Sequence, residues 1–351
     1  MIKLFHSIDQ ASKEDKKRKA SMPTPTTTTT TTTRLKTTTT PTAAAAAAAT
    51  TTTGNGCTYK LVIGNKNYSS WSLRAWLHLK KSGIEFEEIR IPLYTDNYKS
   101  KLLEHSPAGR VPILIDQTCC VDIDIDGTCA ASDGGGGGGG GGGGYLSIWD
   151  SMSIIEYIVE NGANVEATAS TAAAAAATNV IGWPTNKVER AVGRSICYEM
   201  HSGFLCIRDE LPQNVRAKHT LNMETKLSPS CRQQIQRIDD IWKHCITKYA
   251  DNNNESNDND NNSRSSSGGS GNPTWLFGGT KTMTIPDIVY APVALRFVTY
   301  GIQVSQESQR YIAMVVNDPH VQEWIEAAKI EPESLEFIDN LIPASDSPLV
   351  L

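Results

Sequence analysis

Blocks of low-complexity sequence most constrain what this chain can fold into. They include eleven consecutive glycines at 134–144 and long threonine and alanine runs near the N-terminus. Such segments bury too little apolar surface to offset the entropy lost on ordering. We therefore predict that four blocks are disordered and lie outside the folded body: residues 1–57, 117–144, 161–178 and 251–273. The roughly 225 residues left are enough for one or two compact domains.

Charge and cysteine usage narrow the class of protein. The net charge is −5 and no sustained basic face is present, so we expect no nucleic-acid partner. No apolar run reaches the ~18 residues of a membrane span, so we expect no membrane partner. The cysteines show neither a disulfide framework nor metal-type spacing, which predicts a cytoplasmic protein without a metal. The Ser- and Thr-rich N-terminal extension leaves organellar targeting open.

Residues 58–162 alternate between strand and helix patterns. Apolar periodicity gives the order β-α-β-α-β-β-α. The predicted strands are 59–63, 86–91, 113–115 and 145–149, and the predicted helices are 70–81, a weak one at 96–105 and one beginning at 150–151. Gly83 is a candidate for the end of the first helix. The block at 117–144 separates two strands without a helix, so we expect it to replace a hairpin turn.

Residues 179–335 show only helical patterns. The predicted helices are 184–211, 226–249, one beginning at Thr284, 305–316 and 319–329, with 336–351 as a tail. Thr284 and Asp287 resemble a capping box, and Pro286 suits the first turn of that helix. The helix that follows is apolar on nearly all sides, so we expect it at the centre of a helical domain.

Three hydroxyl side chains, Tyr68, Ser69 and Ser70, lie where the first strand passes into the first helix. Helix starts present unpaired N–H groups and a partial positive charge, which suit an anion or an incipient thiolate. A serine at this position is also most simply an N-cap. The residues by themselves leave both interpretations open.

Two further motifs lie at element starts: Arg110-Val111-Pro112 before the third strand, and Asp150-Ser151 before the third helix. Pro112 has no N–H to donate and suits a strand start. Asp150 and Ser151 are most simply N-caps. The same groups at a helix start also suit a ligand that carries a carboxylate and an amine.

A polar stripe occurs in the first predicted helix of the second half. Arg194, His201 and Arg208 recur every seven residues. The stripe is either the solvated border of an amphipathic helix or the lining of a cleft that binds a carboxylate-bearing substrate. Asn214 and Arg216 are similar candidates.

Together these motifs resemble the glutathione transferase family, in particular its serine-type branch, which includes the zeta class (maleylacetoacetate isomerases). The matching segments are Ser-Ser-Trp-Ser-Leu-Arg at 69–74, Gly-Arg-Val-Pro at 109–112, Trp-Asp-Ser at 149–151 and Thr-x-x-Asp at 284–287. The resemblance covers the sequence between the low-complexity blocks. It implies an α/β thioredoxin-like N-terminal domain, an all-α C-terminal domain and a homodimer.

The resemblance also implies a glutathione site. Ser69, or alternatively Ser70 or Tyr68, would donate a hydrogen bond to the glutathione sulfur. A free thiol titrates near 8.5, so little thiolate exists at pH 7 without such help. The bound thiolate would add to an electrophilic small molecule, or add reversibly to a double bond so that the bond can rotate.

The resemblance assigns the remaining contacts to glutathione residue by residue. It implies a cis bond before Pro112 and pairing of Val111 with the cysteinyl part. Asp150 and Ser151 would hold the γ-glutamyl end, and Arg110 the glycyl carboxylate.

The predicted function is therefore a glutathione transferase or isomerase, with His201 and Arg208 at the electrophile. One alternative is a non-catalytic binding scaffold with the same fold. The other is a glutathione-dependent peroxidase, which is less favoured because the loop before Arg74 contains no cysteine.

Overall fold

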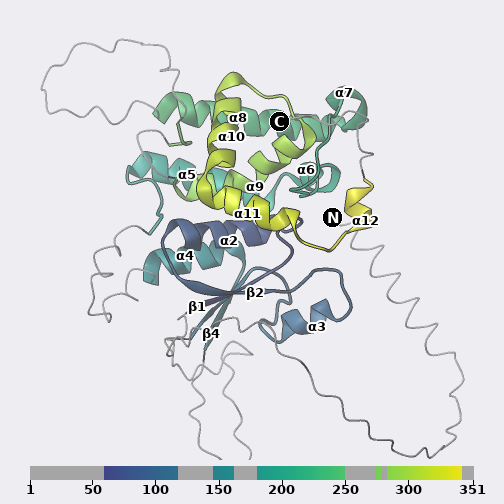
Figure 1. The fold of residues 1–351 in the computed structure, drawn as a ribbon. Helices are drawn as coiled ribbons and strands as arrows, with labels where there is room; N and C mark the ends of the chain where they lie inside the picture. Colours follow the sequence, from purple (N-terminus) through teal and green to yellow (C-terminus); the bar gives the residue numbers. More distant parts are fainter. Residues whose placement is uncertain (1–58, 118–144, 162–179, 250–273, 278–282, 342–351) are drawn as a thin grey trace, which may run out of the picture. The chain divides into compact units, whose positions relative to one another are not determined.

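The computed structural model describes residues 59–117, 145–161, 180–249, 274–277 and 283–341 (Figure 1). Apart from residues 117 and 161 at their edges, the four blocks predicted to be disordered lie outside the described residues.

Four strands form one mixed sheet in the order β2-β1-β3-β4. Their bounds are Tyr59–Ile63 for β1, Phe86–Arg90 for β2, Ile113–Asp116 for β3 and Leu146–Trp149 for β4. β1 pairs parallel with β2 and antiparallel with β3, and β3 pairs antiparallel with β4. The predicted order β-α-β-α-β-β-α is confirmed, and the block at 117–144 connects two neighbouring antiparallel strands as expected.

Helices cover both faces of this sheet (Figure 1). α2 (Ser70–Lys81) and α4 (Ser151–Asn161) lie side by side on one face, and α3 (Tyr98–Leu103) packs on the other. Because side chains alternate along a strand, Leu61 and Ile63 enter the core beneath α2, whereas Val62 joins the smaller core with Leu102 of α3. The expected thioredoxin-like arrangement is confirmed.

Gly83 sets the C-terminal end of α2. Gly83 has φ +67°, a conformation that glycine adopts without steric cost. Its N–H bonds the carbonyl of Lys80 at 3.2 Å, and the N–H of Ile84 bonds that of Leu79 at 3.0 Å. This pattern closes the last turn, so the predicted helix end at Gly83 is confirmed.

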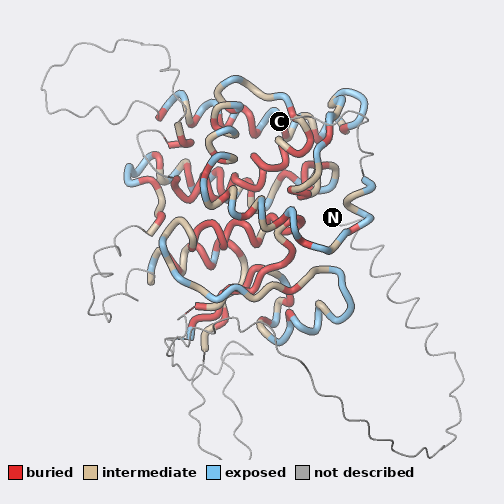
Figure 2. Tube along the Cα trace, in the orientation of Figure 1, coloured by how far each residue is buried: buried red, intermediate tan, exposed pale blue. Residues whose placement is uncertain are grey.

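The remaining described chain is helical, as predicted. The elements are α5 (Lys187–Ser202), α6 (Leu205–Glu210), α7 (Met223–Lys226), α8 (Pro229–Tyr249), α9 (Ile285–Tyr300), α10 (Gln306–Asn317), α11 (Pro319–Lys329) and α12 (Glu336–Asp339). α9 is buried along almost its whole length (Figure 2), which confirms its central position. The Asp287 carboxylate accepts hydrogen bonds from the N–H and hydroxyl of Thr284, both at 2.8 Å, so the pair closes the start of α9.

The single helix predicted at 184–211 is wrong. It breaks between α5 and α6, where Gly203 is extended and Phe204 has φ +56°. Glycine has a low helix propensity, and the side chain of Arg208 folds back to bond the carbonyls of Met200 and Gly203. The side chain therefore replaces backbone partners that a continuous helix would supply.

Two other boundaries need correction. The helix predicted at 226–249 begins at Pro229, because Ser228 caps it by accepting a hydrogen bond from the N–H of Cys231 at 3.1 Å. The predicted tail from residue 336 contains the short helix α12, which the sequence pattern did not indicate.

Candidate functional site

Ser69 is the N-cap of α2. Its hydroxyl accepts a hydrogen bond from the N–H of Ser72 at 3.3 Å and donates to the Ser72 hydroxyl at 2.8 Å. The Ser72 hydroxyl in turn accepts from the N–H of Gly64 at 3.1 Å. These bonds fix the passage from β1 into α2, so the capping interpretation of Ser69 is confirmed.

Ser70 is held differently. Its hydroxyl oxygen accepts a hydrogen bond at 3.1 Å from Nη2 of Arg296, which lies on α9. Arg296 has no proton acceptor to offer, so the O–H of Ser70 remains available to donate. Both serines are 5% exposed.

Tyr68 faces the C-terminal end of the described chain. Its hydroxyl donates to the Asp339 carboxylate at 2.8 Å and accepts from Arg216 Nη2 at 2.8 Å and from the N–H of Leu335 at 3.1 Å. Asp339 lies in the segment predicted to be a tail, so the sequence did not indicate that it would bond Tyr68.

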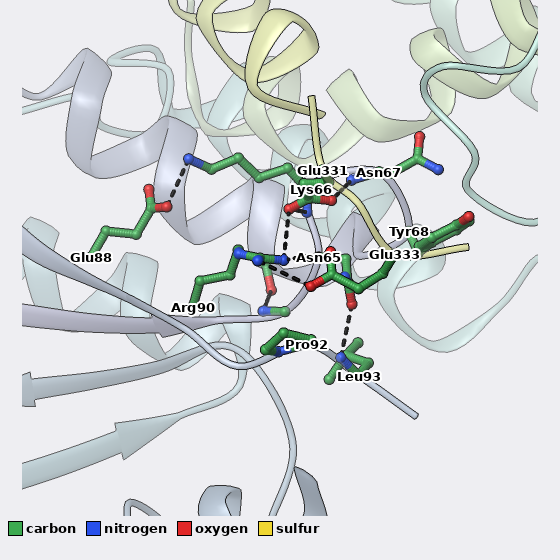
Figure 3. A network of polar contacts seen from close by, with 12 residues as sticks. Asn65, Lys66, Asn67, Tyr68, Glu88, Arg90, Pro92, Leu93, Glu331 and Glu333 are labelled. Carbon is green, nitrogen blue, oxygen red and sulfur yellow. Dashed lines mark hydrogen bonds and ion pairs between the residues drawn. The ribbon is translucent and has the colours of Figure 1, made fainter. Parts of the chain in front are cut away.

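Residues 330–341, named here the C-terminal strap, hold the loop Asn65–Tyr68 through charged groups (Figure 3). The Glu331 carboxylate accepts from the N–H groups of Lys66 at 2.7 Å and Asn67 at 3.0 Å. Glu333 forms a two-bond ion pair with Arg90 at the end of β2, at 2.9 and 3.1 Å. The strap therefore fixes the loop to both the sheet and the helical part.

Asn214 and Arg216 belong to the same network rather than to an open cleft. Asn67 Nδ2 donates to Asn214 Oδ1 at 2.9 Å, and Asn214 Nδ2 donates to Asp339 at 2.8 Å. Arg216 Nη1 donates to the carbonyl of Glu331 at 2.8 Å. Both side chains are therefore held in place by hydrogen bonds within the protein, and their role at a substrate stays a prediction.

The bond between Val111 and Pro112 is cis, as predicted. The ladder of β3 begins at Ile113, so Val111 lies just outside the paired part of the strand. Arg110 is exposed.

Asp150 and Ser151 begin α4. Asp150 has φ +76°, and its Oδ1 accepts from the N–H of Met152 at 2.8 Å. Ser151 is fully buried, and its hydroxyl has no hydrogen-bond partner in the described part of the chain. A buried hydroxyl without a partner is uncommon. Here it lies at a helix start where the N–H groups of Met152 and Ser153 already donate to the Asp150 carboxylate.

His201 lies against Asp150. Nε2 of His201 is 3.2 Å from Oδ2 of Asp150, and the imidazole packs edge-on against Trp71, with 5.0 Å between ring centroids. Burial raises the pKa of the Asp150 carboxyl, but the hydrogen bond and charge of His201 lower it, with the net pKa below its ordinary value. Asp150 is therefore ionised at neutral pH.

A cavity of about 580 Å³ opens beside this pair. Its lining includes Asp150, Ser153 and Glu156 from the start of α4, together with Tyr198 and His201 from α5. The three candidate hydroxyls of the first loop do not line it. Asp150 and His201 are therefore brought together at a cavity, while Tyr68, Ser69 and Ser70 lie apart from that cavity.

The predicted stripe of Arg194, His201 and Arg208 does not form one helix face, because the helix breaks at Gly203, between His201 and Arg208. Arg194 lies 5.3 Å from the Trp183 ring. Arg208 is buried, with its guanidinium 4.6 Å from the Trp71 ring. Only His201 and Arg208 come together, and they do so around Trp71.

Sequence reasoning missed three residues at this centre: Trp71, Arg74 and Arg296. Trp71 contacts His201, Arg208 and Arg74, whose guanidinium lies 4.5 Å from the ring. The sequence did carry a signal for the two arginines. Arg74 and Arg296 each interrupt an otherwise apolar helix face, and a charged side chain is rarely buried without a partner, so such an arginine indicates a special site.

Within the described ranges, no helix is long and apolar enough to cross a bilayer, and no three His, Cys, Asp or Glu side chains are grouped as metal ligands.

Part of the chain matches a known protein family. Residues 68–161 match the family described as glutathione S-transferase, N-terminal domain. A comparison with curated protein sequences gives no match.

A comparison with solved structures also gives matches. A glutathione transferase homolog from Burkholderia gl BGR1 with bound glutathione is 18% identical, covering 77% of this chain and 98% of its own, with a TM-score of 0.43. A tau class glutathione S-transferase from mango (Mangifera indica) is 15% identical, covering 81% and 98%, with a TM-score of 0.47. A glutathione S-transferase from Bombyx mori is also 15% identical, covering 80% and 97%, with a TM-score of 0.47.

The family match includes the hydroxyl loop, the Val111–Pro112 strand entry and the Asp150–Ser151 helix start. Residues 68–161 are thus similar to the N-terminal domain of the glutathione S-transferases.

Proposed function

We propose that this protein binds glutathione and activates its thiol for addition to an electrophilic small molecule. The observation that carries the proposal is the start of α4. There an ionised Asp150 lies beside a buried Ser151 hydroxyl that has no hydrogen-bond partner among the described residues, inside the segment that matches the glutathione S-transferase N-terminal domain.

Each group at the start of α4 suits one part of a γ-glutamyl end. The Asp150 carboxylate pairs with an α-amino group, because opposite charges attract most strongly where water is partly excluded. The Ser151 hydroxyl donates to the α-carboxylate, and the partial positive charge of the helix start favours an anion at this position. In the same proposal Val111 pairs with the cysteinyl part, and exposed Arg110 with the glycyl carboxylate.

A hydroxyl of the first loop would donate to the glutathione sulfur and favour the thiolate. Ser69 and Ser70 differ in whether the hydroxyl proton already has an acceptor. Ser69 already donates to Ser72, whereas the oxygen of Ser70 accepts from Arg296, which leaves its O–H available to donate as far as the described residues are concerned. Tyr68 donates to Asp339. Separate alanine substitutions of Ser69 and Ser70 therefore distinguish the two assignments.

The reaction follows from a bound thiolate. Its sulfur forms a bond to an electrophilic carbon, and a leaving group departs with the electron pair. With a conjugated cis double bond, sulfur adds, the resulting single bond rotates, and sulfur leaves to give the trans isomer. His201 and Arg208 near Trp71 would then face the electrophile, as in a maleylacetoacetate isomerase. We place this activity in a cytoplasmic homodimer.

Calorimetric titration with glutathione tests the binding step. We expect Ser151→Ala and Asp150→Asn each to weaken binding about tenfold, which corresponds to about 1.4 kcal/mol, within the range for losing a partner of a charged group. Ser195→Ala is the control, because that hydroxyl is exposed and bonds only the carbonyl of Ala191. Wild-type protein that binds no glutathione would refute the proposal.

A second candidate is a glutathione-binding protein without turnover. The observation that favours it is the engagement of the Tyr68 and Ser69 hydroxyls in bonds within the protein. Conjugation of an aryl halide and isomerisation of maleylacetoacetate separate the two. Binding of glutathione with neither reaction would support the non-catalytic candidate, and turnover lost in Ser70→Ala or Ser69→Ala would support the enzyme.

A further inference from the structure

Three arginines from three helices are buried around Trp71 and Ser70. These residues, Arg74 of α2, Arg208 of α6 and Arg296 of α9, are named here the arginine cluster. Their exposed fractions are 0%, 6% and 4%. Arg74 and Arg208 both lie against the Trp71 ring, and Arg296 bonds the neighbouring hydroxyl of Ser70. Three positive charges therefore meet in the interior.

One carboxylate acts on the arginine cluster from nearby: the charge of Asp150 raises the pKa of Arg74, although the net pKa is still lowered. No member of the arginine cluster forms an ion pair within the described part of the chain. Arg74 donates through Nε to the carbonyl of Val289 at 3.0 Å, and Arg208 donates to the carbonyls of Met200 and Gly203. Backbone oxygens thus fix where the guanidinium groups lie without neutralising them.

Several nitrogens of the arginine cluster stay without a hydrogen-bond partner among the described residues. They are Nη1 and Nη2 of Arg74, Nη1 of Arg208, and Nε and Nη1 of Arg296. Each carries at least one N–H, and a buried donor without an acceptor is costly. A guanidinium fork matches the geometry of a carboxylate or a similar planar anion.

Charge repulsion adds to this cost. Burial first, and then the charge of Arg208, lower the pKa of Arg74 to about 9. Burial likewise lowers the pKa of Arg296 to about 9, with Arg208 and then Arg74 contributing. Contact with the Trp71 ring offsets only part of the desolvation of two of these cations. An anion placed among them would reverse the repulsion.

We propose that the arginine cluster is a binding site for a small anion, a carboxylate or an inorganic anion of similar size. The three side chains reach the site from separate helices. Backbone carbonyls and Trp71 hold Arg74 and Arg208, and the Ser70 hydroxyl holds Arg296, before any ligand arrives. The arginine cluster shares Arg208 with the proposed electrophile site and contacts Ser70 of the proposed thiol site. Binding of a small anion there requires neither glutathione nor turnover, so it can be tested separately from the proposed function.

Thermal unfolding in the presence of sodium formate tests the site. A ligand that binds only the folded state stabilises it, and a tenfold excess over Kd corresponds to about 1.4 kcal/mol. For a folded body of about 200 residues this is a rise in Tm of roughly 3–6 °C. We expect this rise in wild-type protein and its loss in Arg296→Met.

Arg296→Met should also change the Tm when no anion is added. Methionine fills similar volume without charge, so Arg296→Met should unfold at a Tm equal to or above that of wild type in formate-free buffer. Arg208→Met serves as a second variant if Arg296→Met does not fold. Arg232→Met is the matched control, because Arg232 also bonds backbone carbonyls but lies at the surface of α8. It should keep the full response to formate.

Repeating the titration with saturating glutathione identifies the source of the anion. A formate response that persists assigns the arginine cluster to a free anion, and one that disappears assigns it to a carboxylate of the bound ligand. Either outcome supports the site. Equal formate responses in wild type, Arg296→Met and Arg208→Met would overturn it. Because the first titration contains no glutathione, its result is independent of the proposed function.

Discussion

At the scale of single residues, the candidate site is defined by which hydroxyls have partners. Ser69 is committed to the start of α2, Tyr68 to Asp339, and Ser70 accepts from Arg296. Ser151 is buried without a partner in the described part of the chain. A hydroxyl that caps a helix contributes to stability. A buried hydroxyl without a partner instead indicates a place where a ligand can supply the missing hydrogen bond.

The capping role of Ser69 predicts a stability effect separate from any catalytic one. Ser69→Ala removes the acceptor for the N–H of Ser72, and losing an N-cap costs about 1 kcal/mol. Urea unfolding should show this loss without a change in the m-value. Ser69→Thr keeps the oxygen and should retain most of the stability. Equal stability of Ser69→Ala and wild type would contradict the capping role.

At the scale of elements, two features govern how the helical part meets the first loop. The break between α5 and α6 lets Arg208 turn back toward Trp71. The C-terminal strap ties the loop Asn65–Tyr68 through Glu331 and Asp339, and Trp324 of α11 adds a bond from Nε1 to the carbonyl of Lys66 at 2.9 Å. Both features shape the surroundings of the hydroxyl loop.

A substitution of Gly203 tests the importance of the break between α5 and α6. A Cβ added there would lie 2.8 Å from the carbonyl oxygen of Glu199, closer than side chains approach. Gly203→Ala should therefore force a backbone shift and cost about 1–3 kcal/mol in urea unfolding. Gly182→Ala is the control, because a Cβ there meets nothing within 4 Å. If both variants unfold at the same urea concentration, the close approach at Gly203 is not important.

A substitution of Glu331 tests whether the C-terminal strap holds the loop Asn65–Tyr68. Its carboxylate accepts from two backbone N–H groups, and a glutamine at this position offers only one oxygen. Glu331→Gln should speed hydrogen exchange at the amides of Lys66 and Asn67 by about tenfold or more, as expected for losing about 1.4 kcal/mol of local protection. Glu326→Gln on the exposed face of α11 is the control. Unchanged exchange at both amides would show that the strap does not hold the loop.

At the scale of the whole molecule, buried polar groups connect segments that are distant in the chain. His78 on α2 is fully buried, and its Nε2 lies 2.7 Å from the carbonyl of Ile181 in the segment before α5. Arg74 similarly joins α2 to Val289 on α9. These contacts make the packing between the sheet helices and the all-α region sensitive to protonation.

His78 predicts how stability depends on pH. Burial lowers its pKa to about 4, although the bond to Ile181 acts in the opposite direction. The unfolded state therefore binds the proton at a pH near 6.5 and the folded state only near 4, so stability falls as pH drops through this window. Between pH 7.5 and 4.5 the loss from His78 is about 2–3 kcal/mol.

Urea unfolding at the two pH values checks this. His78→Gln keeps a donor for the carbonyl of Ile181 but cannot be protonated, so it should lose less stability than wild type on acidification. His244→Gln, at an exposed position on α8, is the control and should follow wild type. Parallel pH profiles for wild type and His78→Gln would show that another group is responsible.

The sequence alone determined the order of elements, the starts of α2 and α9, the helix end at Gly83, and the strand entry at Pro112. These features depend on side-chain periodicity and on capping residues within a few positions of each other, so local chemistry is sufficient. It also placed the candidate residues Asp150 and Ser151 correctly at the start of a helix.

Only the tertiary structure decided which polar groups meet. Asp339 reaches Tyr68 across 271 positions of chain, and Arg296 reaches Ser70 across 226. Such pairs leave no periodic trace in the sequence, because each depends on how whole helices pack. The break at Gly203 belongs here as well, since the side chain of Arg208 replaces the missing helical bonds. The arginine cluster around Trp71 exists for the same physical reason: three helices, each with one arginine, converge there.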